Sequence, residues 1–197
     1  MNQAKKLNIL TIFVIITVVL LIVNIGSNMG GYMLKQTTFK ELTVTSDAFD
    51  NNGIMPIRYT GRGEDVSPNL NLLEISKDAQ SIAIIMDDLD IPFIGAFNHW
   101  VIWNIPIQGN IPENITHGDL VSSLGGAIQG VGYGKHRYRG PKPPLFIKKY
   151  HRYQFHVYIL DCSIDLESNG RKNKLLKAMD GHIIQYGSLT GKFRNQQ

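Results

Sequence analysis

The fold is decided by residues 81–106, which read SIAIIMDDLDIPFIGAFNHWVIWNIP. Two apolar runs flank a short segment that carries carboxylates. The first run, residues 82–86, is short, β-branched and uninterrupted, and this pattern predicts a strand that is covered on both faces. We expect that strand to stop at Asp87, because Pro92 marks a loop soon after it. The second apolar run, residues 99–105, predicts a neighbouring strand.

Polar groups are concentrated where these two predicted strands meet. Asp88 and Asp90 follow the first strand, and His99 opens the second. If side chains alternate along the second strand, His99 and Trp103 lie on one face and Trp100 lies on the other. Carboxylates and an imidazole held at the mouth of a sheet predict a binding site.

A second polar stretch, YRGPKPP, spans residues 138–144. Its three prolines fix φ and remove backbone donors, so we expect a stiff loop that is excluded from a central sheet. The tripeptide HRY at residues 151–153 then opens another predicted strand, residues 153–160, in which side chains alternate between two faces.

These motifs together resemble the phosphatidylethanolamine-binding protein family, which includes the Raf kinase inhibitor proteins and their bacterial YbhB/YbcL-like relatives. The family motifs D-x-D-x-P, H-W-V-x-W-N-I-P, G-P-x-P-P and H-R-Y stand here at residues 88–92, 99–106, 140–144 and 151–153. Further family segments resemble residues 59–68, 178–183 and 189–193. The resemblance extends from about residue 42 to residue 194.

The resemblance implies a mostly β fold, an antiparallel two-sheet β-sandwich with a few peripheral α-helices. Short strands such as residues 42–45, separated by Pro- and Gly-rich connections, favour the same arrangement over βαβ units. The clearest helix is expected over Lys172–Met179, with Leu175 and Met179 on its apolar face and its end near Gly181.

The resemblance also implies a small pocket for a phosphate-bearing or zwitterionic ligand, such as a phosphatidylethanolamine head group, and no cofactor. Its expected lining is Asp88, Asp90, Phe97, His99, Gly140, Pro141, Pro143, His151 and Tyr153. Lys142 stands where microbial members have a small residue or Cys, and we expect it to add a positive charge. We expect Asp88 or Asp90 to accept a hydrogen bond from a His ring N–H. The second ring nitrogen of His99 or His151 then faces the ligand.

Other interpretations of these residues stay open. Two Asp and two His are adequate metal ligands, although they lack the short spacing of common metal motifs. A hydrolase needs a nucleophile, but the sequence has no G-x-S-x-G and Cys162 has no activating motif beside it. His182 is interpreted as a packed, hydrogen-bonded side chain. We therefore expect a non-enzymatic binding module, with inhibition of a kinase or protease partner as the alternative and an uncharacterised hydrolase third.

The formal charge of +4 is unevenly distributed, since Lys5, Lys6 and Lys35 supply three of the four charges. The remaining chain is nearly neutral, so the basic pI is no argument for nucleic-acid binding, and we expect no nucleic-acid partner. A basic stretch between Asp119 and Asp161 predicts either a solvated loop or a positive collar around the pocket. Its members are Lys135, Arg137, Arg139, Lys142, Lys148, Lys149 and Arg152.

The N-terminal segment differs from the rest of the chain. Residues 7–25 carry no charge, and a helix over them would be roughly 28 Å long, close to the thickness of a bilayer core. We expect a short cytoplasmic N-terminus at 1–6, a transmembrane anchor at 7–25, a linker at 26–38 and the folded domain at 39–197. Lysines before the span predict an extracytoplasmic domain. Secretion after cleavage of a signal peptide is the alternative.

Overall fold

The computed structural model describes residues 39–92, 95–147 and 149–194, all of which belong to the compact unit Thr37–Gln197. Within these ranges, no helix is both long enough and apolar enough to cross a bilayer. The predicted anchor at residues 7–25 and the linker at 26–38 lie outside the described residues, so both remain predictions.

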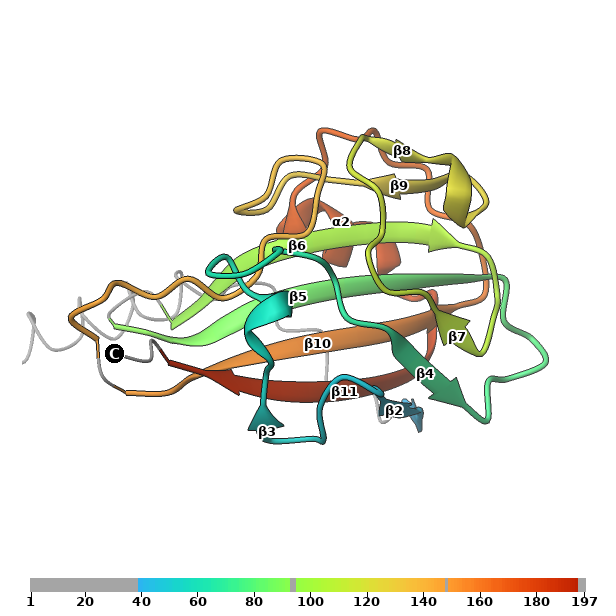
Figure 1. Ribbon diagram of the computed structural model, residues 1–197. Helices are drawn as coiled ribbons and strands as arrows, with labels where there is room; N and C mark the ends of the chain where they lie inside the picture. The colour runs from blue at the N-terminus through green and yellow to red at the C-terminus, as the bar shows by residue number, and fades with distance from the viewer. Residues whose placement is uncertain (1–38, 93–94, 148, 195–197) are drawn as a thin grey trace, which may run out of the picture. The chain divides into compact units, whose positions relative to one another are not determined.

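Four long strands form the centre of the larger sheet (Figure 1). They are β5 (Ser81–Ile91), β6 (Gly95–Ile105), β10 (His151–Leu160) and β11 (Ile183–Phe193). The strand order is β1-β11-β10-β5-β6-β9-β8, and β3 also pairs with β11. The short members are β1 (Lys40–Glu41), β3 (Gly53–Ile54), β8 (Leu120–Val121) and β9 (Ala127–Gln129). The long strands pair antiparallel, as predicted, whereas β1 and β3 run parallel to β11.

A smaller antiparallel sheet covers one face of the larger one (Figure 1). It consists of β2 (Thr43–Thr45), β4 (Leu70–Leu73) and β7 (Asn110–Ile111). The hydrophobic core lies between the two sheets, where Val44 and Leu72 of the small sheet join Ile84 and Phe155 of the large sheet in one buried cluster. The predicted two-sheet arrangement is therefore confirmed.

The helix α2 (Lys172–Met179) lies on the opposite face of the large sheet (Figure 1). Its bounds are those predicted, and Leu175, Leu176 and Met179 are buried. Gly181 follows with φ +84°, a left-handed conformation that glycine adopts without strain and that commonly ends helices. Two 3₁₀ turns, η1 (Ile57–Tyr59) and η2 (Ser122–Leu124), complete the helical elements of the described residues.

The predicted end of the first strand at Asp87 is wrong, because β5 continues to Ile91 and β6 already begins at Gly95. Asp87 is buried inside the sheet, where its carboxylate binds Lys172 Nζ at 2.5 Å and Asn98 Nδ2 at 3.1 Å. A strand tolerates buried carboxylates when each one has such partners. The acidic residues therefore lie within the arms of a hairpin and not in its loop.

The predicted alternation along β6 is confirmed for Trp100 and Trp103, since only Trp100 belongs to the core between the two sheets, but it is wrong for His99. Met86 pairs with Trp100 and Asp87 pairs with Asn98, so His99 is an extra residue on β6. This β-bulge interrupts the alternation between His99 and Trp100, whose side chain faces the core between the two sheets. It also directs His99 toward that side, where its ring contacts Tyr153.

Candidate functional site

A buried hydrogen bond between a histidine and a carboxylate joins β5 to the start of β10. His151 Nδ1 lies 2.8 Å from Asp88 Oδ2, and both side chains are at most 3% exposed. The strand register explains this contact, because Asp88 pairs with Tyr153 and His151 lies two residues earlier on the same face of β10. The other carboxylate oxygen, Oδ1, accepts the backbone N–H of Asp90 at 2.9 Å. The expected Asp–His hydrogen bond is thus present, between Asp88 and His151.

Tyr153 is buried between the two imidazoles of the site. Its ring centroid lies 6.4 Å from that of His151 and 5.3 Å from that of His99. Burial raises the pKa of Tyr153 well above its usual value, and the charge of Asp88 and a hydrogen bond to that carboxylate raise it further. The phenol therefore stays protonated and acts as a hydrogen-bond donor toward Asp88.

The orientation of His99 is fixed by a loop of the backbone. Its Nδ1 lies 2.7 Å from the carbonyl oxygen of Arg139, and because a carbonyl only accepts, Nδ1 carries a proton. Burial lowers the pKa of His99 below its usual value, so the ring is neutral near pH 7. Its other nitrogen, Nε2, then presents a lone pair and becomes a donor only when the ring gains a second proton. Phe97 and Tyr133 pack around this ring, with centroids at 5.5 and 5.4 Å.

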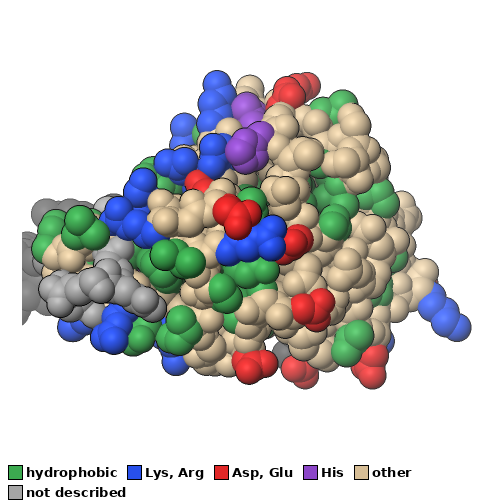
Figure 2. Space-filling view, viewed as in Figure 1, with side chains coloured by type: hydrophobic (Ala, Val, Ile, Leu, Met, Phe, Trp, Pro, Cys, Tyr) green, Lys and Arg blue, Asp and Glu red, His purple; other side chains and the backbone are tan. Residues whose placement is uncertain are grey.

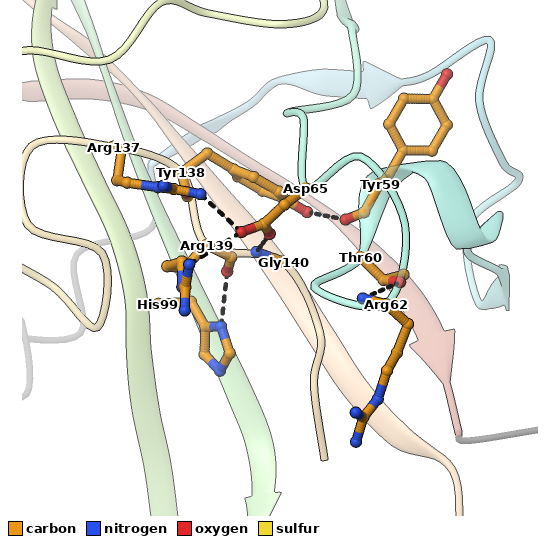
Figure 3. Close-up of polar contacts among 9 residues, drawn as sticks. All are labelled: Tyr59, Thr60, Arg62, Asp65, His99, Arg137, Tyr138, Arg139 and Gly140. Carbon is orange, nitrogen blue, oxygen red and sulfur yellow. Dashed lines mark hydrogen bonds and ion pairs between the residues drawn. The ribbon is translucent and has the colours of Figure 1, made fainter.

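A carboxylate that the sequence analysis did not select holds the loop beside His99 in place (Figure 3). Asp65 accepts hydrogen bonds from Arg137 Nη2 at 2.7 Å, from Arg139 Nη1 at 3.3 Å and from the backbone N–H of Gly140 at 2.7 Å. Tyr138, which lies between the two arginines, donates its hydroxyl to the carbonyl of Tyr59 at 2.7 Å. Asp65 therefore positions the carbonyl of Arg139 and, through it, the imidazole of His99.

Asp90 has a different partner from the one expected. Its carboxylate accepts three hydrogen bonds from Arg152, two from the guanidinium at 2.7 and 2.9 Å and one from the backbone N–H at 2.8 Å. The hydrogen bond from the Arg152 side chain lowers the pKa of Asp90. Asp90 is thus an ionised carboxylate that is already neutralised within the protein.

The basic stretch is only partly available as a positive collar. Arg137 and Arg139 are paired with Asp65, and Arg152 is paired with Asp90. Lys135, Lys142 and Lys149 are exposed, and Lys148 lies outside the described residues. The uncompensated charge of this stretch therefore comes from lysines rather than from arginines.

The proline loop is fastened to the turn that follows η1. Gly61 donates its N–H to the carbonyl of Pro141 at 2.9 Å, and Arg62 donates to the carbonyl of Pro143 at 3.0 Å. The aliphatic stem of Lys142 packs against Gly61, where an added Cβ would lie 3.1 Å from the Cβ of Lys142. Lys142 therefore extends along the turn, and the structure connects it to Gly61 and not to either histidine of the site.

Contacts in the structure thus connect Asp88, Phe97, His99, His151 and Tyr153 at one end of the large sheet. Tyr133 and Asp65 belong to the same group but were missed, and Arg139 was expected only as part of the positive collar. Asp65 lies within residues 59–68, which the sequence analysis used only as a sign of the family resemblance. Tyr133 lies on a loop and donates its N–H to the carbonyl of Asn98 at 2.9 Å, so its contact with His99 depends on tertiary structure and not on a local pattern.

A partly apolar pocket of about 430 Å³ lies beside this group. Phe193, one of its walls, pairs directly with His151 across β10 and β11. Tyr150 and Arg194, which stack at 4.6 Å, also line it. The remaining lining residues are Ile54, Met55, Pro56, Ile57, Arg62 and Leu145. Hydrophobic and basic side chains are interspersed over the left part of the face seen in Figure 2.

These features define a small two-sheet β-sandwich with a buried Asp–His pair and a second, neutral histidine at one end of its large sheet. Residues 45–194 match the family model for phosphatidylethanolamine-binding proteins. The chain belongs to the phosphatidylethanolamine-binding protein family. The family is named for binding a molecule rather than for a chemical reaction.

Individual relatives agree with this assignment. A UPF0098 protein of Pyrococcus abyssi is 40% identical over 158 residues, which cover 80% of this chain and 88% of that protein. A solved structure from Chlamydia trachomatis, described as a phosphatidylethanolamine-binding protein homolog, is 31% identical with a TM-score of 0.69 and covers 80% of this chain and 99% of that one. Escherichia coli YbcL is 25% identical with a TM-score of 0.71, covering 79% and 99%.

Proposed function

We propose that this chain is a non-enzymatic binding module for phosphate-bearing ligands, including zwitterions such as phosphoethanolamine. The observation that carries the proposal is the pair of imidazoles, His99 and His151, on either side of Tyr153. Each uses Nδ1 within the protein, His99 toward Arg139 and His151 toward Asp88. Each therefore has Nε2 to offer to a ligand, and a protonated Nε2 is a strong donor to phosphate oxygens.

The charges around the pair support an anion as the main ligand group. Asp88 already accepts hydrogen bonds from His151 and from the N–H of Asp90, and Asp90 is neutralised by Arg152. These carboxylates therefore repel an incoming phosphate less than free carboxylates would. A ligand ammonium group has to compete with Arg152 for Asp90, so we expect phosphate recognition to supply most of the affinity.

The apolar pocket beside His151 favours a ligand that carries an acyl chain over a free head group. Its walls include Phe193, Leu145 and Ile57, and the last two are more than half exposed. Burying about 100 Å² of acyl surface there would add roughly 2.5 kcal/mol. By contrast, another pocket, of about 370 Å³, is lined by Asp119, Asp165 and Glu167 and is unsuited to an anion.

Calorimetric titration of the purified protein with phosphoethanolamine tests the proposal. Loss of one charge-assisted hydrogen bond costs roughly 1.5–3 kcal/mol, so His99→Ala and His151→Ala should each weaken binding at least tenfold. His182→Ala is the matched control, because His182 also bonds a carboxylate, that of Asp161, but at the other end of β10. Equal affinity of the wild type and His99→Ala would show that the ligand binds elsewhere.

A second titration separates the two sources of the phosphate group. A lysophospholipid with an ethanolamine head group should bind more tightly than phosphoethanolamine, and Leu145→Ser should reduce only the lipid's affinity. If both ligands bind equally and Leu145→Ser changes neither, the ligand is a soluble phosphate ester. Binding of neither ligand, together with capture of a kinase or protease, would favour the inhibitor role.

We also propose that the module is attached to a membrane through residues 7–25, with the domain on the extracytoplasmic side. The support is the uncharged sequence of this segment after Lys5 and Lys6. Extraction of cell membranes with alkaline carbonate should leave the full-length chain in the membrane pellet. A shortened form in the soluble fraction would instead identify a cleaved signal peptide.

A further inference from the structure

Three side chains with different donor atoms meet where β10 ends and β11 begins. They are Asp161 and Cys162, which follow β10, and His182, which precedes β11. One ligand atom from each, a carboxylate oxygen, a thiol sulfur and an imidazole nitrogen, lies within 4.8 Å of the other two. His182 is exposed and not packed as the sequence analysis expected, and its Nδ1 lies 2.9 Å from Asp161 Oδ1.

The backbone that carries these side chains is fixed before any ligand arrives. Asp161 donates its N–H to the carbonyl of His182 at 3.1 Å, which ties the two segments together. Ser81, at the start of β5, donates its hydroxyl to the carbonyl of Cys162 at 2.5 Å. Beyond the cluster, Leu160 pairs with Ile183 in the sheet. The arrangement of the three donors is therefore a property of the fold and not of a mobile loop.

We propose that Asp161, Cys162 and His182 form a site for a zinc-like divalent cation. Zn²⁺ takes sulfur, nitrogen and oxygen ligands at about 2.0–2.3 Å, so three protein ligands of a tetrahedral site lie about 3.5 Å apart. Reaching that separation from the present one requires side-chain movements of about 1 Å. The exposed side chains of Asp161 and His182 can make these movements without disturbing the core. Water occupies the fourth position.

The chemistry of the cluster favours a cation over an isolated hydrogen bond. An exposed Asp–His pair alone contributes little to folding, and it does not explain a thiol beside the same carboxylate. On binding, the thiol releases its proton to the solvent and the sulfur binds the metal as a thiolate. The neutral imidazole of His182 carries its proton on Nε2 instead of Nδ1, and the Asp161–His182 hydrogen bond is replaced by two metal bonds.

This site is independent of the anion site. Strand β10 carries His151 at its first residue and ends with Leu160, next to Asp161. Ten residues of antiparallel strand span roughly 30 Å, so the two sites lie at opposite ends of the sheet. A bound metal would fasten both ends of the segment that contains α2, since Asp161 and Cys162 precede this helix and His182 follows it.

The test is titration of the full chain, freed of affinity tag and treated with chelator, with Zn²⁺ and separately with Co²⁺. The wild type should bind one equivalent of Zn²⁺ with release of a proton, seen as a binding heat that depends on the buffer. The Co²⁺ form should show a sulfur-to-cobalt charge-transfer band and a tetrahedral ligand-field spectrum. Cys162→Ser should abolish the charge-transfer band, and His182→Ala and Asp161→Asn should each weaken Zn²⁺ binding at least tenfold.

His117→Ala, a change at another exposed histidine, is the control and should leave binding unchanged. Thermal melting of each chelated variant shows whether it folds. Folding should be preserved, because the side chains of Asp161 and His182 are 45% and 48% exposed and His117 is exposed as well. Zn²⁺ affinity that is equal in the wild type and in all three cluster variants would overturn the proposal. So would a wild-type Co²⁺ spectrum without a sulfur band.

Discussion

Replacement of Asp65 tests whether this carboxylate positions the loop beside His99. Asp65→Ala removes the acceptor of the Gly140 N–H, a hydrogen bond to a charged group worth roughly 1.5–3 kcal/mol. It also removes two ion pairs with partly exposed arginines, which contribute about 0.2–1 kcal/mol each. Asp65 has φ +61°, and Ala in this left-handed conformation costs about 1 kcal/mol more than Asp or Asn. The free energy of unfolding should therefore fall by roughly 3–6 kcal/mol.

Asp65→Asn separates these contributions. Its amide oxygen still accepts the Gly140 N–H and Asn tolerates the positive φ, so only the charge is lost and we expect a decrease of about 1–2 kcal/mol. Urea unfolding followed by the fluorescence of the buried Trp100 and Trp103 measures both variants. Asp47→Ala is the control, because Asp47 bonds Asn69 and Asn71 on the surface. If Asp65→Ala and Asp47→Ala lower the free energy of unfolding equally, Asp65 does not hold the loop beside His99 in place.

Three further predictions follow from the histidines and from the domain boundary. Burial lowers the pKa of His99, so an anion that requires the protonated ring should bind more tightly as the pH falls from 7.5 to 5.5. Inorganic sulfate is the suitable ligand, because its charge is constant in this range. Sulfate affinity that does not change with pH in calorimetry would contradict the assigned role of Nε2. Burial also lowers the pKa of His156 to about 4, so between pH 6.5 and 4 the unfolded chain binds more protons than the folded one, and the free energy of unfolding should decrease as the pH falls through this range. His156→Gln should make the free energy of unfolding depend less on pH in this range. An unchanged slope would show that other groups cause the dependence. A chain that starts at Phe39 should melt cooperatively, and its melting should not depend on reducing agent because the sequence has one Cys. Aggregation of this shortened chain in every buffer would show that folding requires the preceding residues.

The long strands and the helix were predictable because their sequence patterns are local. Residues 82–86 are apolar on both faces and lie fully buried, and the apolar spacing in Lys172–Met179 matches a helix packed on a sheet. The extension of β5 through Asp87 was not predictable, because the partners that compensate this carboxylate, Lys172 and Asn98, come from distant parts of the chain.

The candidate site was predictable in its members and less so in its pairings. The motifs brought His99, His151 and Asp88 together correctly, but they did not reveal that Asp90 binds Arg152. A pairing of charges depends on register, and a one-residue shift reverses every side chain of a strand. The bulge at His99 is such a shift, and no local signal in the sequence of β6 indicates it.

The two neighbouring carboxylates of β5 help to set the register of this strand in the sheet. Asp87 bonds Lys172 of α2 on one face of the sheet, and Asp88 bonds His151 on the other. The residues before them, from Ile82 to Met86, are apolar on both faces, so a slip by one position would exchange similar side chains. The apolar residues of β5 therefore discriminate poorly between the correct alignment and a shifted one, whereas Asp87 and Asp88 would each lose their partner in a shifted one. Strand β10, with Phe155 on one face and His156 on the other, adds a further asymmetry that favours one alignment.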